Sequence, residues 1–224
     1  VDEAINGHAS FIEVVLHADG MSLSVTDNGR GIPVDIHPIE KRSALEVIFT
    51  TLHAGGKFEG DNYKKSGGLH GVGSSVVNAL ATELVASIKR NGRLHVQRFS
   101  RGVPVTEVED VEAATGTGTT IFFRPDPEIF EELDFNTEVI RERLEMKSYL
   151  TAGLRVVYKD EKAKARHEFK HEGGIEDMLK QQIEREKISP VHPETLRFQT
   201  DDADGDGTQI DCVMQWPEST NETI

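Results

Sequence analysis

The sequence has little cysteine, few aromatic residues and no long apolar run, and each shortage excludes a class of protein. A single cysteine, Cys212, among 224 residues excludes an intrachain disulfide framework and is typical of a reducing compartment such as the cytoplasm. No apolar stretch approaches the roughly 20 residues that a membrane-spanning helix needs, and no signal peptide is visible. We therefore expect no association with a membrane.

Positive charge is also scarce: 25 lysine and arginine residues face 39 aspartate and glutamate residues, and the formal net charge is −14. A general nucleic-acid binder needs lysines and arginines to displace phosphate counterions, so the acid excess argues against that function for this segment. Hydrophobic residues make up 37% of the chain, but periodic apolar segments recur along most of it and predict a folded core. The length predicts one domain, or one domain and part of a second.

Turn residues and apolar periodicity predict hairpins interspersed with helices. The expected strands cover residues 11–17, 21–26, 119–124, 154–159 and 166–171, and two more flank the Asn91-Gly92 turn. The expected helices run from Ser43 to Leu52, from Gly73 through Leu80, from Thr137 to Tyr149 and onward from Gly174, with a hairpin turning at residues 204–207 after the last. Hairpins dominate and strands do not alternate strictly with helices, so we predict an α+β layered fold with a soft domain boundary at Gly173.

Two of these helices carry specific expectations. In the first, Ser43 and Glu46 form a capping-box pattern, and Leu45, Ile48, Phe49 and Leu52 are expected to share one apolar face. In the second, Val76, Val77 and Leu80 are expected to be buried.

One short motif suggests a metal site. His167-Glu168-Phe169-Lys170-His171 matches the zinc peptidase pattern H-E-x-x-H, which requires both imidazoles one helical turn apart. The segment alternates as a strand, which would separate the two histidines by roughly 13 Å at about 3.3 Å per residue. That is too far for a shared zinc ion, so a zinc metallopeptidase using His167 and His171 stays only as a remote alternative.

Two glycine-rich segments favour a nucleotide site. Asp27 stands at a strand end before Gly29 and Gly31, which offers a carboxylate acceptor beside backbone that a flat ligand can approach closely. The second run, residues 67–73, supplies backbone N–H groups at the start of a helix, where the helix dipole suits phosphates. Lys57, Lys64 and Lys65 add positive charge on the segment between.

Three segments carry a family resemblance: TDNGRGIP at residues 26–33, LHAGGKF at 52–58, and SGGLHGVG at 66–73 followed by VVNAL at 76–80. Together they resemble the ATPase region of the DNA gyrase B family of type IIA topoisomerases. This is a GHKL ATPase, a type shared with Hsp90, MutL and histidine kinases. Shorter matches continue to Gln215-Trp216, so the resemblance covers essentially the whole chain. It implies a GHKL (Bergerat-type) two-layer sandwich of helices and a mostly antiparallel mixed sheet over residues 1–172, then the beginning of a transducer domain, ribosomal S5 domain 2-like, over residues 173–224.

The resemblance also implies an ATP site. Asp27 would accept a hydrogen bond from the adenine amino group, and Thr119 would support the same adenine–water network. The base pocket would be lined by Gly31, Ile32, Pro33 and Ile48. The remaining nucleotide contacts would come from Lys57, Tyr63 and the ATP lid, Gly67, Gly68, Leu69, His70, Gly71, Val72 and Gly73. Glu3 and Arg30 would pair at the pocket mouth together with Arg90, where coumarin-like inhibitors of the family bind; for Tyr63 and Arg90, ordinary surface placement is an equal alternative.

The chain begins at Val1 inside what reads as a helix and stops at Ile224 without a cap or tail, so we expect an internal fragment. The resemblance places the general-base glutamate and the Mg²⁺-binding asparagine upstream of Val1, and a lysine loop that senses the γ-phosphate beyond Ile224. No catalytic or metal-binding residue is therefore assigned in this chain, Glu3 included. We expect the 224 residues alone to bind ATP without turnover.

The implied function is that of an ATP-hydrolysing type II DNA topoisomerase, an isomerase that supercoils DNA negatively with ATP and Mg²⁺. ATP would close the lid and drive two copies of the chain to dimerise as a gate. The implied partners are the DNA gyrase A protein, in an A2B2 heterotetramer, and double-stranded DNA bound through the cytoplasmic holoenzyme. Two alternatives remain: the paralogous topoisomerase IV protein and a non-catalytic nucleotide-binding module. The sequence Asp61-Asn62-Tyr63-Lys64 weakly favours gyrase over topoisomerase IV.

Overall fold

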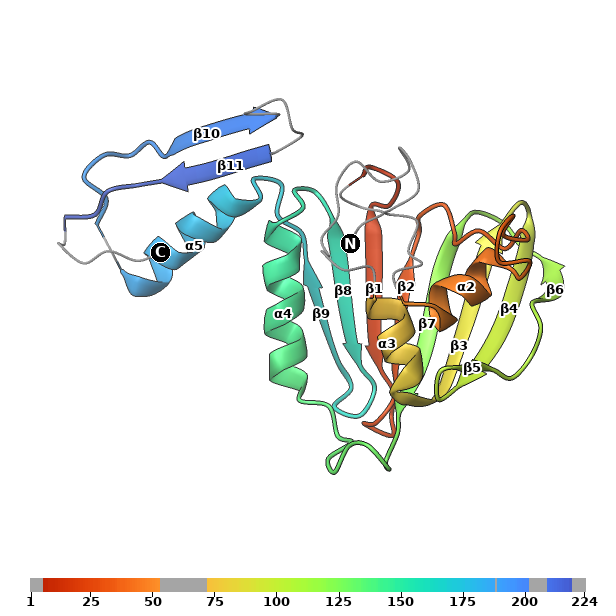
Figure 1. Ribbon diagram of the computed structural model, residues 1–224. Helices are drawn as coiled ribbons and strands as arrows, with labels where there is room; N and C mark the ends of the chain where they lie inside the picture. Colours follow the sequence, from red (N-terminus) through yellow and green to blue (C-terminus); the bar gives the residue numbers. More distant parts are fainter. Residues whose placement is uncertain (1–5, 53–71, 188, 202–208, 219–224) are drawn as a thin grey trace.

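A nine-stranded sheet forms the centre of the molecule (Figure 1). The computed structural model describes residues 6–52, 72–187, 189–201 and 209–218. The strand order is β5-β4-β3-β7-β2-β1-β8-β9, and β6 also pairs with β4. The strands are β1 Phe11–Leu16, β2 Leu23–Asp27, β3 Ala81–Arg90, β4 Arg93–Ser100, β5 Val103–Pro104, β6 Glu109–Ala113, β7 Gly118–Pro125, β8 Arg155–Asp160 and β9 Ala165–Phe169.

The sheet is mixed but mostly antiparallel, as predicted. Strands β1 and β8 run parallel, and the other pairings between the described strands of this sheet are antiparallel. The Asn91-Gly92 turn joins β3 to β4 with positive φ angles at both residues, 52° and 74°, which is the type I′ geometry that suits the twist of a hairpin. The predicted strands at residues 11–17, 119–124, 154–159 and 166–171 are confirmed to within two residues at each end.

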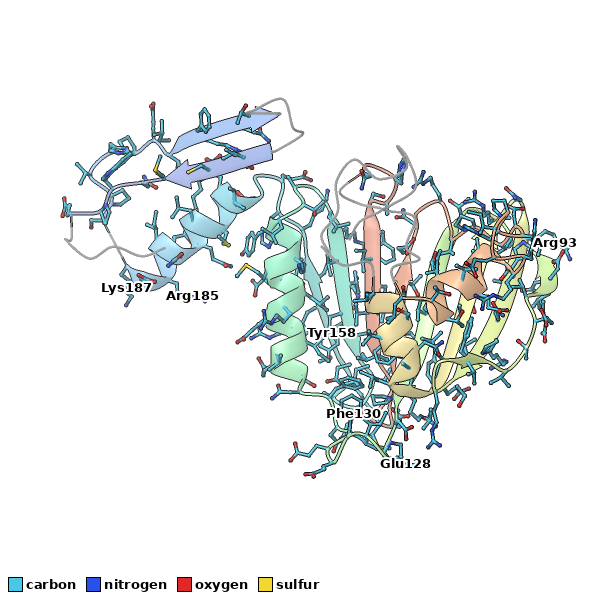
Figure 2. All side chains as sticks on the ribbon, viewed as in Figure 1. Arg93, Glu128, Phe130, Tyr158, Arg185 and Lys187 are labelled. Carbon is cyan, nitrogen blue, oxygen red and sulfur yellow. The ribbon has the colours of Figure 1, made fainter. Side chains whose placement is uncertain are left out.

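Three helices cover one face of this sheet (Figure 1). They are α2 Ala44–Thr50, α3 Gly73–Ala79 and α4 Thr137–Tyr149. Ile140 and Leu144 of α4 pack against a cluster that includes Val14 and Tyr158, and Figure 2 labels Tyr158 on β8. Leu45 of α2 belongs to a second cluster over β3 and β4. The predicted two-layer α+β sandwich is therefore confirmed.

Two expectations about α2 and α3 are wrong. Helix α2 ends at Thr50, and Leu52 is 62% exposed instead of sharing the apolar face. In α3, Val76 is 39% exposed, and the buried residues are Ser75 and Asn78. In α3, Ser74 and Asn78 donate hydrogen bonds to the end of α2, a polar contact that the apolar periodicity of the segment does not predict.

The last part of the chain forms helix α5 Ile175–Glu186 and a separate two-stranded antiparallel sheet, β10 Leu196–Asp201 and β11 Gln209–Met214. The predicted helix and hairpin are both confirmed. The buried Tyr149 of α4 connects this part to the main sheet: its hydroxyl donates to Gln181 Oε1 at 2.6 Å, and its ring stacks on His171 at 3.7 Å. The boundary at Gly173 stays a prediction.

Among the residues that the structure describes, no helix combines the length and the apolar character needed to cross a bilayer.

Candidate nucleotide-binding site

Asp27 lies at the end of β2, in the middle of the large sheet. Its register partners are Ile12 on β1 and Thr119 on β7, so the predicted pair Asp27 and Thr119 lie side by side on adjacent strands. The Asp27 carboxylate accepts a hydrogen bond from the Gly29 backbone N–H at 2.8 Å, which fixes the first turn of the glycine-rich loop. The sheet thus holds an acidic side chain at a strand end, next to a threonine that is 8% exposed.

Val25 forms an exposed apolar surface next to this carboxylate. Side chains two residues apart on a strand share a face, so Val25 and Asp27 point to the same side of the sheet. Val25 pairs with Val14 and Ile121, residues whose clusters lie on the helix-covered face. Yet Val25 is 37% exposed, so helices α2, α3 and α4 do not cover it completely. The sequence-based prediction did not include Val25, because its position two residues before Asp27 does not reveal that the helices leave it exposed.

Two glycines bring backbone close to this point. A Cβ on Gly118, whose φ is +150°, would lie 2.3 Å from the Asp27 carbonyl oxygen. A Cβ on Gly31, whose φ is +75°, would lie 2.6 Å from the Lys89 carbonyl oxygen. Real Cβ atoms do not approach that closely, so only glycine allows β7 and the loop after β2 to take these positions.

Arg90, which the prediction assigned with Arg30 to the pocket mouth, contacts the backbone of the glycine-rich loop. The Arg90 guanidinium donates from Nη1 to the carbonyl oxygens of Gly31, at 2.8 Å, and Arg30, at 3.2 Å. Arg90 therefore holds the backbone of the glycine-rich loop, and its role at the pocket mouth stays a prediction. Glu3, the expected third member, lies outside the described residues.

Asn28 is a structural residue of this loop that the sequence-based prediction missed. Its Oδ1 accepts from the backbone N–H groups of Ser10 and Phe11, at 2.9 and 3.0 Å, and its Nδ2 donates to Ser10 Oγ. These bonds tie the loop to the start of β1. The signal was available in the Asp-Asn-Gly sequence, because asparagine side chains in turns often bond to nearby backbone.

The remaining predicted residues fall into two groups. Ile32 and Ile48 are partly buried against the cluster that contains Leu45 and Phe49, whereas Pro33 is exposed. Val72 is the N-cap of α3, and Gly73 is its first residue. Outside the described residues lie Lys57, Tyr63, Gly67, Gly68, Leu69, His70 and Gly71.

The suggested zinc site has no support in the structure. His167 lies on β9 opposite Tyr158, and His171 follows the strand and stacks on Tyr149, so the pattern is not helical. Among the described residues, no group of three or more His, Cys, Asp or Glu side chains could hold a metal ion.

Comparison with known proteins gives consistent relatives. Residues 1–129 match the family of histidine kinase-, DNA gyrase B- and HSP90-like ATPases. The chain is 44% identical to the DNA gyrase B protein of Thermotoga maritima, with 100% of this chain and 35% of that protein covered, and 41% identical to that of Streptococcus pyogenes serotype M3, with 100% and 34% covered. It therefore spans about a third of the length of these curated relatives. These names do not favour the topoisomerase IV alternative.

A solved structure agrees with the fold. The crystal structure of the 43K ATPase domain of Thermus thermophilus gyrase B, in complex with an aminocoumarin, superposes with a TM-score of 0.77 at 39% sequence identity, covering 89% of this chain and 50% of that one. The family match covers more than half of the chain and includes every described residue of the candidate site. The chain therefore belongs to the family of histidine kinase-, DNA gyrase B- and HSP90-like ATPases.

Proposed function

We propose that this chain is the ATP-binding part of a DNA gyrase B protein. The observation that carries the proposal is the position of Asp27: its carboxylate stands beside the partly exposed Val25, at a strand end where Gly118 and Gly31 allow close approach of neighbouring backbone. That arrangement suits a flat base carrying a hydrogen-bond donor at its edge.

In this proposal the adenine amino group donates to the Asp27 carboxylate, and Thr119 supports the same contact through water. Val25 and Ile121 offer an apolar surface to the purine, because they are paired on adjacent strands two residues from Asp27. Gly31, Ile32, Pro33 and Ile48 border the base. The triphosphate is assigned to Lys57, Tyr63 and residues 67–73, with catalysis depending on positioning and electrostatic stabilisation rather than on a covalent nucleophile.

Mg²⁺ accompanies ATP in the chemistry that the resemblance implies. The described residues do not fit a site for it, since none of their acidic and histidine side chains form a group that could hold a metal. We assign no Mg²⁺ ligand and no general base within residues 1–224, and we derive no step through the ion.

The wider proposal concerns the whole gyrase B protein. It acts with the DNA gyrase A protein and with a second copy of itself on double-stranded DNA in the cytoplasm, where ATP binding drives dimerisation and strand passage introduces negative supercoils. Residues 1–172 form the ATPase domain, and residues 173–224 begin the transducer domain. The names of the relatives support the gyrase B part of this proposal.

The ATP site is tested by Asp27→Asn in the full-length protein. The amide keeps the size of the side chain but replaces one acceptor oxygen by a donor, so we expect ATP affinity in calorimetry to fall by more than tenfold, about 1.4 kcal/mol. Asp134→Asn, at a carboxylate 72% exposed beside Lys162, is the matched control and should bind ATP as the wild type does. Equal affinity in the Asp27→Asn protein would contradict the assignment.

The wider proposal is tested by mixing the full-length protein with the DNA gyrase A protein and relaxed plasmid. We expect ATP-dependent negative supercoiling with the wild type and its loss with Asp27→Asn. Decatenation without supercoiling would instead indicate a topoisomerase IV protein.

A further inference from the structure

Helix α2 ends without two of the common C-terminal caps. Its C-cap residue, Thr51, has an extended backbone with φ −119° and ψ 130°, and the last turn contains no basic residue. The carbonyls of a last helical turn have no partner within the helix, and they usually find one through a glycine reversal or a cationic side chain. Helix α2 has neither.

Helix α3 supplies the missing donors. Asn78 Nδ2 donates to the Phe49 carbonyl oxygen at 2.9 Å, and Ser74 Oγ donates to the Ile48 carbonyl oxygen at 3.2 Å. Ser74 and Asn78 are four residues apart, so they lie on the same face of α3. One helix thus closes the end of the other through two side chains.

Asn78 is the stronger of the two links. Its side chain is fully buried, and its own carbonyl oxygen accepts from the Gly102 N–H at 3.1 Å, in the turn between β4 and β5. Its Oδ1 is buried without a hydrogen-bond partner among the described residues. A buried amide with an unsatisfied oxygen is costly, so the donor bond to α2 is the interaction that explains an asparagine here.

The bond from Asn78 to Phe49 lies next to Ile48. Ile48 immediately precedes Phe49 and packs, like Ile32, against the cluster of Leu45 and Ile88. We propose that Asn78 is a positioning residue of the nucleotide site, which fixes the end of α2 so that Ile48 borders the base. The inference rests on the proposed ATP function, and it assigns Asn78 no contact with the nucleotide.

The test is steady-state ATP hydrolysis by the full-length protein carrying Asn78→Ala. Loss of the bond frees the end of α2, so we expect KM for ATP to rise about tenfold with kcat within about twofold of the wild type, because the pocket wall contributes to ground-state and transition-state binding alike. Ser74→Ala removes the companion bond at a less buried position, folds more readily, and should raise KM about threefold.

Ser148→Ala is the matched control. Ser148 is fully buried and donates to the Glu145 carbonyl oxygen at 2.6 Å within its own helix, α4, which supplies no residue of the candidate site. Its removal should lower the thermal midpoint while KM stays within about twofold of the wild type. Unchanged KM in both Asn78→Ala and Ser74→Ala would overturn the inference alone, whereas failure of the wild-type protein to bind ATP would overturn the proposed function itself.

Discussion

At the residue scale, the candidate site depends on the lack of a side chain at Gly118 as much as on the carboxylate of Asp27. Asp27 lies where it does because β7 begins beside its carbonyl oxygen, and Gly118 makes that approach possible. The acid and the glycine therefore act as a pair from strands more than 90 residues apart in the sequence.

Gly118→Ala tests this pair. A Cβ 2.3 Å from the Asp27 carbonyl oxygen must displace one of the two strand ends, so we expect a loss of about 1–3 kcal/mol in the free energy of unfolding and a fall in ATP affinity of more than about tenfold. Gly116→Ala is the matched control: its φ is also positive, at +73°, but a Cβ there meets no atom within 4 Å. If both variants bound ATP equally well, the close approach would not matter to the site.

Part of this site could be predicted from the sequence for a physical reason. Asp27, Gly31 and the loop between them are local signals, since a carboxylate and two glycines within five residues already describe a tight turn beside an acceptor. Val25 and Asn78 were not identified, because their roles depend on what lies across the sheet or on another helix. Val25 reads as an ordinary strand residue until the helices are seen to leave it exposed.

At the element scale, a helix boundary is predicted accurately when a nearby residue sets it, and less accurately when a contact with a distant strand or helix does. Helix α4 occupies its predicted range, because Asn136 caps it locally by accepting from the Val139 N–H at 3.1 Å. Of the two hydrogen bonds expected for the capping box of α2, one forms: Ser43 Oγ accepts from the Glu46 N–H. The Glu46 carboxylate instead accepts from Arg42 and from the fully buried Gln97, a partner on β4 that no local pattern contains.

The β8–β9 hairpin gives a prediction of pH dependence. Glu168 accepts hydrogen bonds from Arg155 and Arg166, which lower its pKa from an ordinary value of 4.5 to about 2. A carboxylate with a lowered folded-state pKa binds its proton more weakly when folded. It therefore contributes stability above the unfolded-state pKa, and that contribution is lost as the pH falls from 4.5 toward about 2.

Urea unfolding across that pH range measures the effect. Glu168→Gln should make the free energy of unfolding fall less steeply with decreasing pH than in the wild type. Glu172→Gln is the matched control, because the Glu172 carboxylate is 74% exposed and pairs only with Lys170 in the described structure. This variant should keep the wild-type dependence of the unfolding free energy on pH. Identical slopes for the wild type and Glu168→Gln would contradict the role given to the two arginines.

At the scale of the whole molecule, the class of fold was predictable but the order of the strands was not. Hairpin signals identify neighbours such as β3 and β4, because the turn lies between them in the sequence. The parallel pairing of Phe11 with Arg155, by contrast, joins residues 144 positions apart. Such a register depends on packing over the complete core, and no local pattern of either strand specifies it.

The most direct test of the account compares ATP with inosine triphosphate, in which a carbonyl oxygen replaces the adenine amino group. If Asp27 accepts a hydrogen bond from that amino group, the wild-type protein should bind ATP at least about tenfold more tightly than inosine triphosphate. Asp27→Asn, which presents an amide donor, should abolish or reverse the preference. An unchanged ratio of the two affinities in the variant would contradict the claim that Asp27 recognises the base.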